Sequence, residues 1–234
     1  MDSSENIVFA YLSHLGFQEV VYEPDGNVPP DFLLDGRIAV EVRRLNQNAQ
    51  TVSGPHGLEE VAKPLWAHMK RLVESLGPPT ARASWYVCYR FRRPVPPWKQ
   101  LEPRLRTVLL DFRDGTNHQR TRMDCDDGFH LQFLAAGTLY PTFFVLGGCV
   151  DRDSGGWVLP ELERNLCICV AEKSRKVARV RAKYPEWWLL LVDHIGHGLS
   201  DVDREQFRQQ LRMVHDWDKI ILVDPLNPKR AFEV

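Results

Sequence analysis

The chain has 234 residues and a formal net charge of −1 at pH 7, and 44% of its residues are hydrophobic and 26% charged. This composition is typical of a globular protein and excludes a general electrostatic attraction to nucleic acid or membranes, so any polyanion site must come from local clustering. The five cysteines form no CxxC pair, and no hydrophobic run approaches the ~20 residues that span a membrane. Because the first residues also lack a signal-peptide pattern, we expect a soluble, reduced, cytoplasmic protein.

The chain begins with a helix followed by three strands. Apolar residues at helical spacing predict a serine-capped helix over residues 3–15, which Gly16 would end. Residues 18–23 alternate as a strand. Residues 30–44 then hold two short apolar strands that flank Asp35-Gly36, a pair typical of tight turns.

Helices and strands alternate through the rest of the chain. We predict helices over residues 58–76, 97–112, 172–183 and 201–215, and strands over residues 85–91, 129–134, 142–146, 166–170, 187–192 and 219–223. The run 187–192 is apolar throughout, as in a buried central strand. The alternation predicts an α/β protein, a single three-layer αβα domain over residues 1–234 with a central mixed sheet. The polar segment 113–127 is the candidate for a flexible insert.

Charged residues in the paired strands of residues 30–44 give the clearest indication of chemistry. Residues two apart share a strand face, so Glu41 and Arg43 point together while Val42 points the other way. Buried charge on a strand is costly unless it meets a metal, a phosphate or an opposite charge. Asp31 and Glu41 would supply the oxygen ligands that Mg²⁺ prefers. The alternative is a strand-start aspartate beside a Glu41–Arg43 ion pair.

The turn between these strands decides whether the two acids meet. A two-residue loop at Asp35-Gly36 would pair Asp31 with Val40 and send the acids to opposite faces. A three-residue loop would shift the pairing by one residue and place Asp31 diagonal to Glu41 on one face, within reach of one ion. Both geometries are allowed by the sequence.

The order of a helix, a strand, a strand opened by Pro30-Asp31, and a strand with Glu41-x-Arg43 resembles the PD-(D/E)XK, or restriction-endonuclease-like, nuclease superfamily. The resemblance covers residues 1–45, and a looser similarity extends over the basic helix and residues 187–193. It implies a restriction-endonuclease-like arrangement of the three layers.

The resemblance also implies roles for individual residues. Asp31 and Glu41 would bind the metal together with the backbone carbonyl of Val42, and Glu5 in the first helix would be an assisting acid. Arg43 stands where the family usually has a catalytic lysine. Because arginine binds phosphate as a fork but is a poor proton carrier, this departure bears on activity more than on fold.

The predicted helix over residues 172–183 is strongly basic. Its candidate nucleic-acid-binding residues are Lys173, Arg175, Lys176, Arg179 and Lys183. Arg175, Arg179 and Lys183 form an i, i+4, i+8 stripe without interleaved acids, which suits a helix that binds a nucleic-acid backbone. The ordinary alternative is a solvated helix face.

A second candidate metal site follows the apolar run 187–192. Asp193, His194 and His197 lie at the carboxyl end of this strand, where α/β sheets often place their sites, and they could bind zinc. A loop of ordinary turn residues is the alternative at this position.

These features predict metal-dependent hydrolysis of phosphodiester bonds with Mg²⁺ or Mn²⁺, on nucleic acid for which DNA is the preferred interpretation and RNA the open alternative. The alternative is a catalytically inactive nuclease-fold module that binds nucleic acid or a protein partner. We expect no membrane partner, and the sequence leaves the oligomeric state open.

Overall fold

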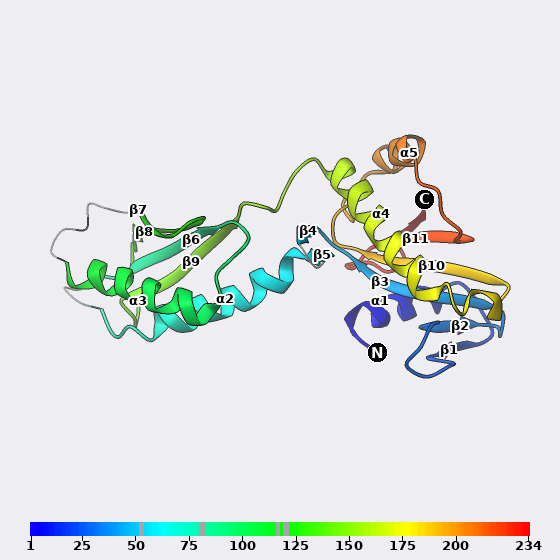
Figure 1. The fold of residues 1–234 in the computed structure, drawn as a ribbon, viewed down its shortest axis with the longest axis horizontal. Helices are drawn as coiled ribbons and strands as arrows, with labels where there is room; N and C mark the ends of the chain where they lie inside the picture. Colours follow the sequence, from blue (N-terminus) through cyan, green and yellow to red (C-terminus); the bar gives the residue numbers. More distant parts are fainter. Residues whose placement is uncertain (52–53, 80–82, 116–117, 119–121) are drawn as a thin grey trace. The chain divides into compact units, whose positions relative to one another are not determined.

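The computed structural model describes residues 1–51, 54–79, 83–115, 118 and 122–234 (Figure 1). Within this part, the chain is a mixed α/β protein with five α-helices, and none of its helices is both long and apolar enough to cross a membrane. The chain divides into two compact units, unit 1 (Met1–Asn48 and Gly156–Val234) and unit 2 (Ala49–Gly155). Each unit has its own sheet and hydrophobic core, which differs from the single domain expected over residues 1–234.

Unit 1 is built on a six-stranded mixed sheet. The strand order is β1 (Val20–Tyr22), β2 (Phe32–Leu34), β3 (Ile38–Leu45), β10 (Glu186–Asp193), β11 (Lys219–Val223) and β12 (Ala231–Glu233). Strands β1 to β3 are antiparallel, β3, β10 and β11 are parallel, and β12 is antiparallel to β11. Because β10 lies between two parallel neighbours and is buried almost throughout, the expected central strand is confirmed.

Helices cover both faces of the unit 1 sheet. Helix α1 (Ser3–Leu12) packs against Trp188, Leu190 and Val192 of β10. Helices α4 (Val158–Val177) and α5 (Asp201–Gln210) pack against the alternate side chains, such as Leu189 and Leu191. Figure 1 shows α1 and α4 on opposite sides of the strands. The alternation follows from the two-residue period of a strand, and each fully buried leucine contributes roughly 1.5–3 kcal/mol.

Unit 2 combines a four-stranded sheet with two helices. The strand order is β7 (Arg122–Asp126), β8 (Phe129–Ala135), β6 (Trp85–Phe91) and β9 (Phe144–Asp151). Strands β6 and β9 are parallel and the other pairs antiparallel. Helices α2 (Leu58–Glu74) and α3 (Trp98–Asp114) bury the Val87, Tyr89 and Phe133 side of the sheet. The short strands β4 (Asn48–Thr51) and β5 (Gly54–Gly57) pair with each other.

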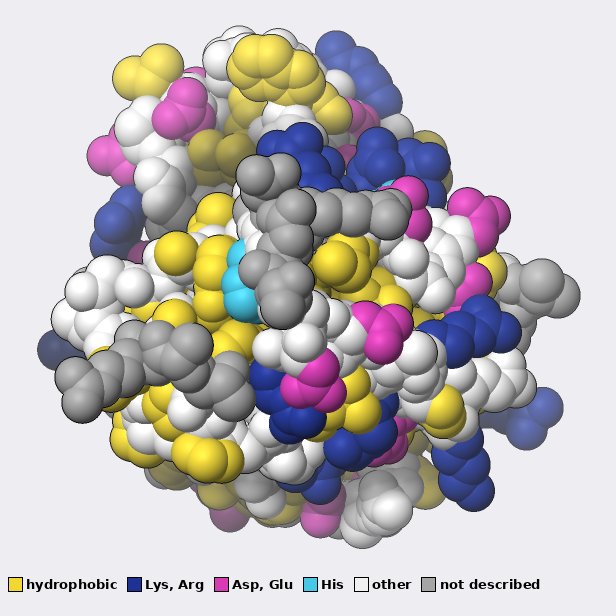
Figure 2. Space-filling view, turned by 90° about the vertical axis from the view of Figure 1, so that its left-hand side faces the viewer, with side chains coloured by type: hydrophobic (Ala, Val, Ile, Leu, Met, Phe, Trp, Pro, Cys, Tyr) yellow, Lys and Arg dark blue, Asp and Glu magenta, His cyan; other side chains and the backbone are white. Residues whose placement is uncertain are grey.

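The outer surface carries charges of both signs. In the view of Figure 2, Lys and Arg side chains form several separate groups between acidic and hydrophobic ones rather than one continuous patch.

Helix α4 replaces the strand expected over residues 166–170. Its buried residues include Leu162, Leu166, Cys169 and Lys173, which recur every three or four positions. The apolar run is therefore one turn of a helical stripe. A run of only five apolar residues is too short for its periodicity to distinguish a helix from a strand. The expected strand is wrong.

The basic helix expected over residues 172–183 is also interrupted. Helix α4 ends at Val177, and Arg181–Lys183 form a separate 3₁₀ turn. The predicted stripe of basic residues is consequently not presented by one continuous helix.

The polar segment expected as a flexible insert over residues 113–127 is partly folded. Residues 113 and 114 end α3, and residues 122–126 form β7, which pairs with β8. Only Met123 and Cys125 of β7 are apolar, and both pack against the core of unit 2, so the sequence signal for this strand is weak. Residues 116–117 and 119–121 of the segment lie outside the described residues.

Candidate functional site

The connection between β2 and β3 sets the positions of the two acids. Asp35 and Gly36 have φ values of 46° and 66°, as in a type I′ turn, and the N–H of Arg37 donates to the carbonyl of Leu34 at 3.0 Å. The ladder nevertheless pairs Leu34 with Ile38. Arg37 is therefore an extra residue in the manner of a β-bulge, and the observed register is neither of the two expected from the sequence.

This register faces Asp31 with Glu41. The last ladder pair joins Phe32 to Val40, and one further step along both strands places the two acids opposite each other. The N–H of Val42 donates to Asp31 Oδ2 at 2.7 Å. Because one residue of shift moves a whole strand to the other face, the bulge is what brings the acids together. Val40 and Val42 belong to the core beneath α1, as the predicted alternation requires.

Glu41 is fully buried and contacts two lysines of α4. Lys173 Nζ lies 2.6 Å from Glu41 Oε2 and 3.6 Å from Asp31 Oδ2, and Lys176 Nζ lies 3.3 Å from Glu41 Oε2. Among the described residues, Glu41 Oε1 has no hydrogen-bond partner. Burial raises the pKa of Glu41, and the charge of Lys173 offsets this effect only in part. Burial lowers the pKa of Lys176, but the charges of Glu41 and Asp31 raise it by more.

Arg43 forms a different ion pair from the one expected. Its guanidinium donates from Nε at 3.0 Å and from Nη2 at 2.7 Å to Glu172 Oε2 of α4. Its Nη1 donates to the carbonyl of Arg44 at 3.2 Å. These bonds fix the orientation of the guanidinium. The cation beside Asp31 and Glu41 is therefore Lys173, and the alternative Glu41–Arg43 pair is not formed.

Glu5 takes part in the start of α1. The carboxylate of Asp2 accepts the N–H groups of Ser4 and Glu5 at 2.7 and 2.8 Å, and Glu5 Oε2 accepts the N–H of Asp2 at 2.5 Å. This capping box makes Asp2 the cap, one residue before the serines expected there. The hydroxyl of Tyr22 also donates to Glu5 Oε2 at 3.0 Å. Glu5 thus has a structural function in addition to its predicted assisting role.

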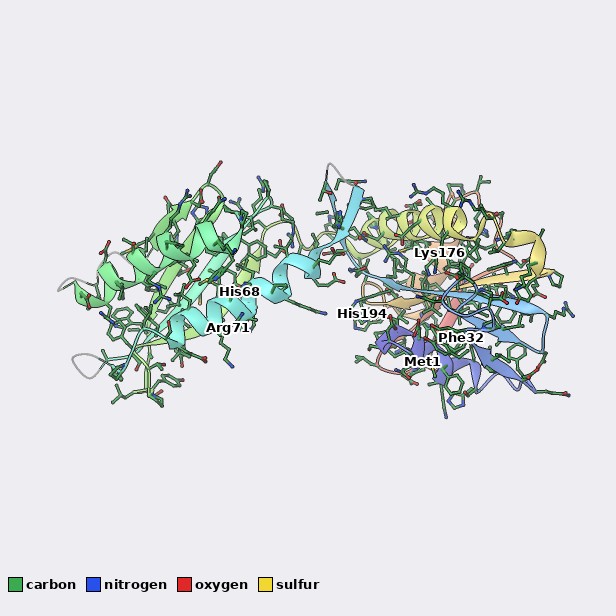
Figure 3. All side chains as sticks on the ribbon, turned by 60° about the horizontal axis from the view of Figure 1, so that its bottom comes forward. Met1, Phe32, His68, Arg71, Lys176 and His194 are labelled. Carbon is green, nitrogen blue, oxygen red and sulfur yellow. The ribbon has the colours of Figure 1, made fainter. Side chains whose placement is uncertain are left out.

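The expected site residues line one cleft of about 560 Å³ in unit 1. The amino terminus of α1, the start of β2, strand β3 and helix α4 contribute to it. Its lining includes Glu5, Asp31, Val42, Arg43, Lys173 and Lys176. Glu41 lies buried next to this lining. Figure 3 marks Lys176 on α4 and Met1 near the start of α1. The structure therefore places Asp31 and Val42 in the lining of one cleft, with Glu41 facing Asp31.

The remaining basic residues do not share one role. Arg175 and Arg179 are exposed, and Arg175 Nε donates to the carbonyl of Ala171 at 3.1 Å. Lys183 pairs with Asp25. The position of Lys173 is the feature that the sequence reasoning missed. Lys173 lies four residues after the buried Cys169 and four residues before the buried Val177, so it is on the apolar stripe of the helix. This position on the stripe is the sequence signal for a buried lysine.

The loop after β10 uses Asp193 as a turn residue. Asp193 Oδ1 accepts the N–H groups of Ile195 and Gly196, both at 2.8 Å. In the described parts of the chain, no group of three or more His, Cys, Asp and Glu side chains is placed to hold a metal ion. The zinc alternative at Asp193, His194 and His197 gains no support.

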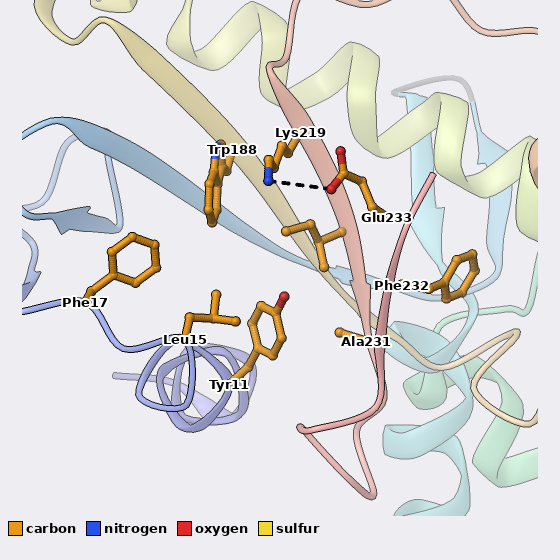
Figure 4. A pocket seen from close by; sticks show the side chains of 9 residues that line it. Tyr11, Leu15, Phe17, Trp188, Lys219, Ala231, Phe232 and Glu233 are labelled. Carbon is orange, nitrogen blue, oxygen red and sulfur yellow. Dashed lines mark ion pairs between the residues drawn. The ribbon is translucent and has the colours of Figure 1, made fainter.

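A second pocket of unit 1, about 280 Å³, is lined mainly by aromatic and aliphatic side chains (Figure 4). Lys219 Nζ lies 4.7 Å from the centroid of the Trp188 ring and 3.7 Å from Glu233 Oε2. Since the lysine already has both an aromatic and an acidic partner, we assign no reaction to this pocket.

Comparisons with protein-family models, with curated proteins and with solved structures find no match to this chain. The superfamily resemblance therefore stays an expectation that rests on the residues of unit 1.

Proposed function

We propose that unit 1 hydrolyses phosphodiester bonds of nucleic acid in the cleft of Asp31 and Glu41 with a divalent metal ion. The observation that carries this proposal is the convergence of two carboxylates and the ammonium of Lys173 at one cleft. The order of α1, β1, β2 and β3, with α4 leading into β10, agrees with the restriction-endonuclease-like arrangement that the resemblance implies.

The donor atoms suit Mg²⁺ or Mn²⁺. Magnesium is usually held by one or two carboxylates and completes its shell with water and phosphate oxygens. Glu41 Oε1 is buried without a partner among the described residues, and an orphaned carboxylate oxygen beside a cleft is a candidate ligand. Asp31 and Glu41 would hold the ion, with the carbonyl of Val42 as the further ligand that the resemblance implies. The bound ion would supply Lewis acidity and an activated water.

The protein groups around the acids have separate tasks. The N–H of Val42 holds Asp31 through Oδ2 and fixes the direction of the carboxylate. Lys173 stabilises negative charge that develops at phosphorus. Arg43, fixed by Glu172, binds a phosphate of the substrate. Lys176, with its side chain 46% exposed, binds a neighbouring phosphate from the rim of the cleft.

One observation favours the second candidate, an inactive module that binds nucleic acid. Lys173 and Lys176 already neutralise Glu41, and Glu172 neutralises Arg43, so the charges are paired without a metal. Such a module would bind nucleic acid equally well with and without EDTA and would not cleave it.

The test is cleavage of labelled DNA and RNA, single-stranded and double-stranded, by the full chain with Mg²⁺ or Mn²⁺. Asp31→Asn and Glu41→Gln should each lower the rate by at least about 10²-fold. Asp127→Asn, which removes an exposed carboxylate of unit 2, is the matched control and should leave the rate unchanged. Absence of cleavage by the wild type with either ion, or equal loss in the control, would contradict the proposal.

A further inference from the structure

The sheet of unit 2 has one face that no helix covers among the described residues. Helices α2 and α3 both pack on the opposite face. Strand register defines two rows across the uncovered face, one from Arg122 through Gln132 to Cys88 and the next from Asp124 through His130 to Arg90. A concave pocket of about 300 Å³ lies over these rows, and Arg152, just after β9, also lines it.

Arginines dominate the charge of this pocket. Arg90, Arg122 and Arg152 are exposed, and within the described residues none of them forms an ion pair. The one acid of the lining, Asp124, contacts His130 with 2.6 Å between Oδ1 and Nδ1.

Acids next to this pocket are engaged with another arginine. Asp151 and Asp153, which flank Arg152 in the sequence, both bind Arg93, at 2.7 and 3.2 Å. Three guanidinium groups therefore line one pocket that has a single carboxylate, that of Asp124, so positive charge is in excess there and the like charges repel one another. An anionic ligand would supply the missing charge.

Two aromatic rings lie outside the lining of this pocket, and one of them is on the same sheet face. Tyr86 is two residues before Cys88 on β6 and so shares its face. The hydroxyls of Tyr86 and Tyr140 are hydrogen-bonded to each other, and their ring centroids are 5.6 Å apart. A Cβ at Gly147 would lie 2.9 Å from Cys88 Sγ and 3.0 Å from the Cβ of Tyr86, both too close. Glycine at this position therefore avoids a steric clash with the Cys88 and Tyr86 side chains.

We propose that the uncovered face of unit 2 binds single-stranded nucleic acid. Arg90, Arg122 and Arg152 bind backbone phosphates, and the Tyr86–Tyr140 pair packs against a base. A duplex is read by a helix or a narrow ribbon that enters a groove, whereas a broad sheet face with aromatic rings suits unpaired bases. The proposal does not rest on catalysis in unit 1.

Fluorescence anisotropy of a labelled single-stranded oligonucleotide of about 12 nucleotides tests this proposal. The full chain is titrated in EDTA, so that cleavage cannot occur. The double variant Arg90→Glu/Arg152→Glu should bind about tenfold more weakly than wild type, and the slope of log K against log salt should fall by about 1.4. The matched control Arg71→Glu/Lys99→Glu reverses two charges on α2 and α3 and should stay within about twofold of wild type.

The competition experiment below gives one result that would overturn the proposal, and three direct binding results would do the same. These are no binding by the wild type, equal weakening in both double variants, and equal affinity for a duplex of the same sequence. Inorganic pyrophosphate serves as a competitor: if it displaces the oligonucleotide completely at equal phosphate concentration, the site binds small phosphates and the nucleic-acid assignment is wrong. Arginine-dependent binding without any metal-dependent cleavage would support this proposal and contradict only the proposed function of unit 1.

Discussion

Replacement of Lys173 by methionine should destabilise unit 1 through the carboxylate of Glu41. The side chain of Glu41 is 0% exposed and that of Lys173 is 9% exposed, and removal of one partner of a buried ion pair costs about 3–5 kcal/mol. Lys176 remains 3.3 Å from the same oxygen, so we expect a loss of about 3 kcal/mol in the free energy of unfolding. Lys176→Met, which removes a half-exposed partner, should cost no more than about 1 kcal/mol.

The pH dependence of this loss tests its cause. Burial raises the pKa of Glu41 above the ordinary value of 4.5. Between 4.5 and this raised pKa the native state binds more protons than the unfolded state, so stability falls as pH rises through that range. Without Lys173 the pKa of Glu41 rises further. The deficit of Lys173→Met should therefore be larger at about pH 8 than at about pH 5, and addition of Glu41→Gln should remove most of it.

Hydrogen exchange of β10 amides during urea unfolding in EDTA is the assay, because it reports on unit 1 alone. A deficit below about 1 kcal/mol, or one that is equal at both pH values and unaffected by Glu41→Gln, would refute the reasoning.

Three further predictions follow from single side chains. Gly36→Val places a β-branched residue at φ +66° and should lower the free energy of unfolding by about 1–2 kcal/mol in a urea titration; an unchanged midpoint would mean that the turn is not as described. Arg43→Ala breaks a pair with the half-exposed Glu172 and should cost at most about 1 kcal/mol of stability in the same titration, while it weakens binding of DNA; a larger loss would assign it a structural role instead. Burial raises the pKa of Cys169 to about 11, so mass spectrometry after alkylation at about pH 8 should find Cys169 unmodified and the exposed Cys149 modified, and equal labelling would contradict the burial of α4.

Much of the fold follows from local sequence signals. Strands β6 and β11 begin and end where their apolar patterns predict, and the apolar run of β10 identified a central strand. The division into two units was not predicted, because the polar segment 47–57 and the glycine pair 155–156 at its boundaries look like ordinary loops, and strong helix and strand signals continue through both units. Helix α4 was divided wrongly because its apolar stripe and its basic residues look like separate elements in short windows.

The candidate site was predictable in its acids but not in its cation. Two residues of spacing put Glu41 and Arg43 on one strand face, yet their partners come from Glu172 and Lys173, more than a hundred residues later in the chain. No local pattern encodes such a pairing. The turn shows the same limit, because Asp35-Gly36 predicts the type I′ geometry while the extra residue Arg37, which aligns Asp31 with Glu41, depends on the packing of both strands.

Binding of Mn²⁺, measured by electron paramagnetic resonance on the purified chain, tests the central claim most directly, since ion binding must precede metal-dependent cleavage. We predict that the wild type and Asp127→Asn bind one Mn²⁺ ion in the cleft and that Asp31→Asn loses it. Wild-type protein that binds no Mn²⁺, or an Asp31→Asn variant that binds it as tightly as the wild type, would contradict a metal-dependent site at Asp31 and Glu41.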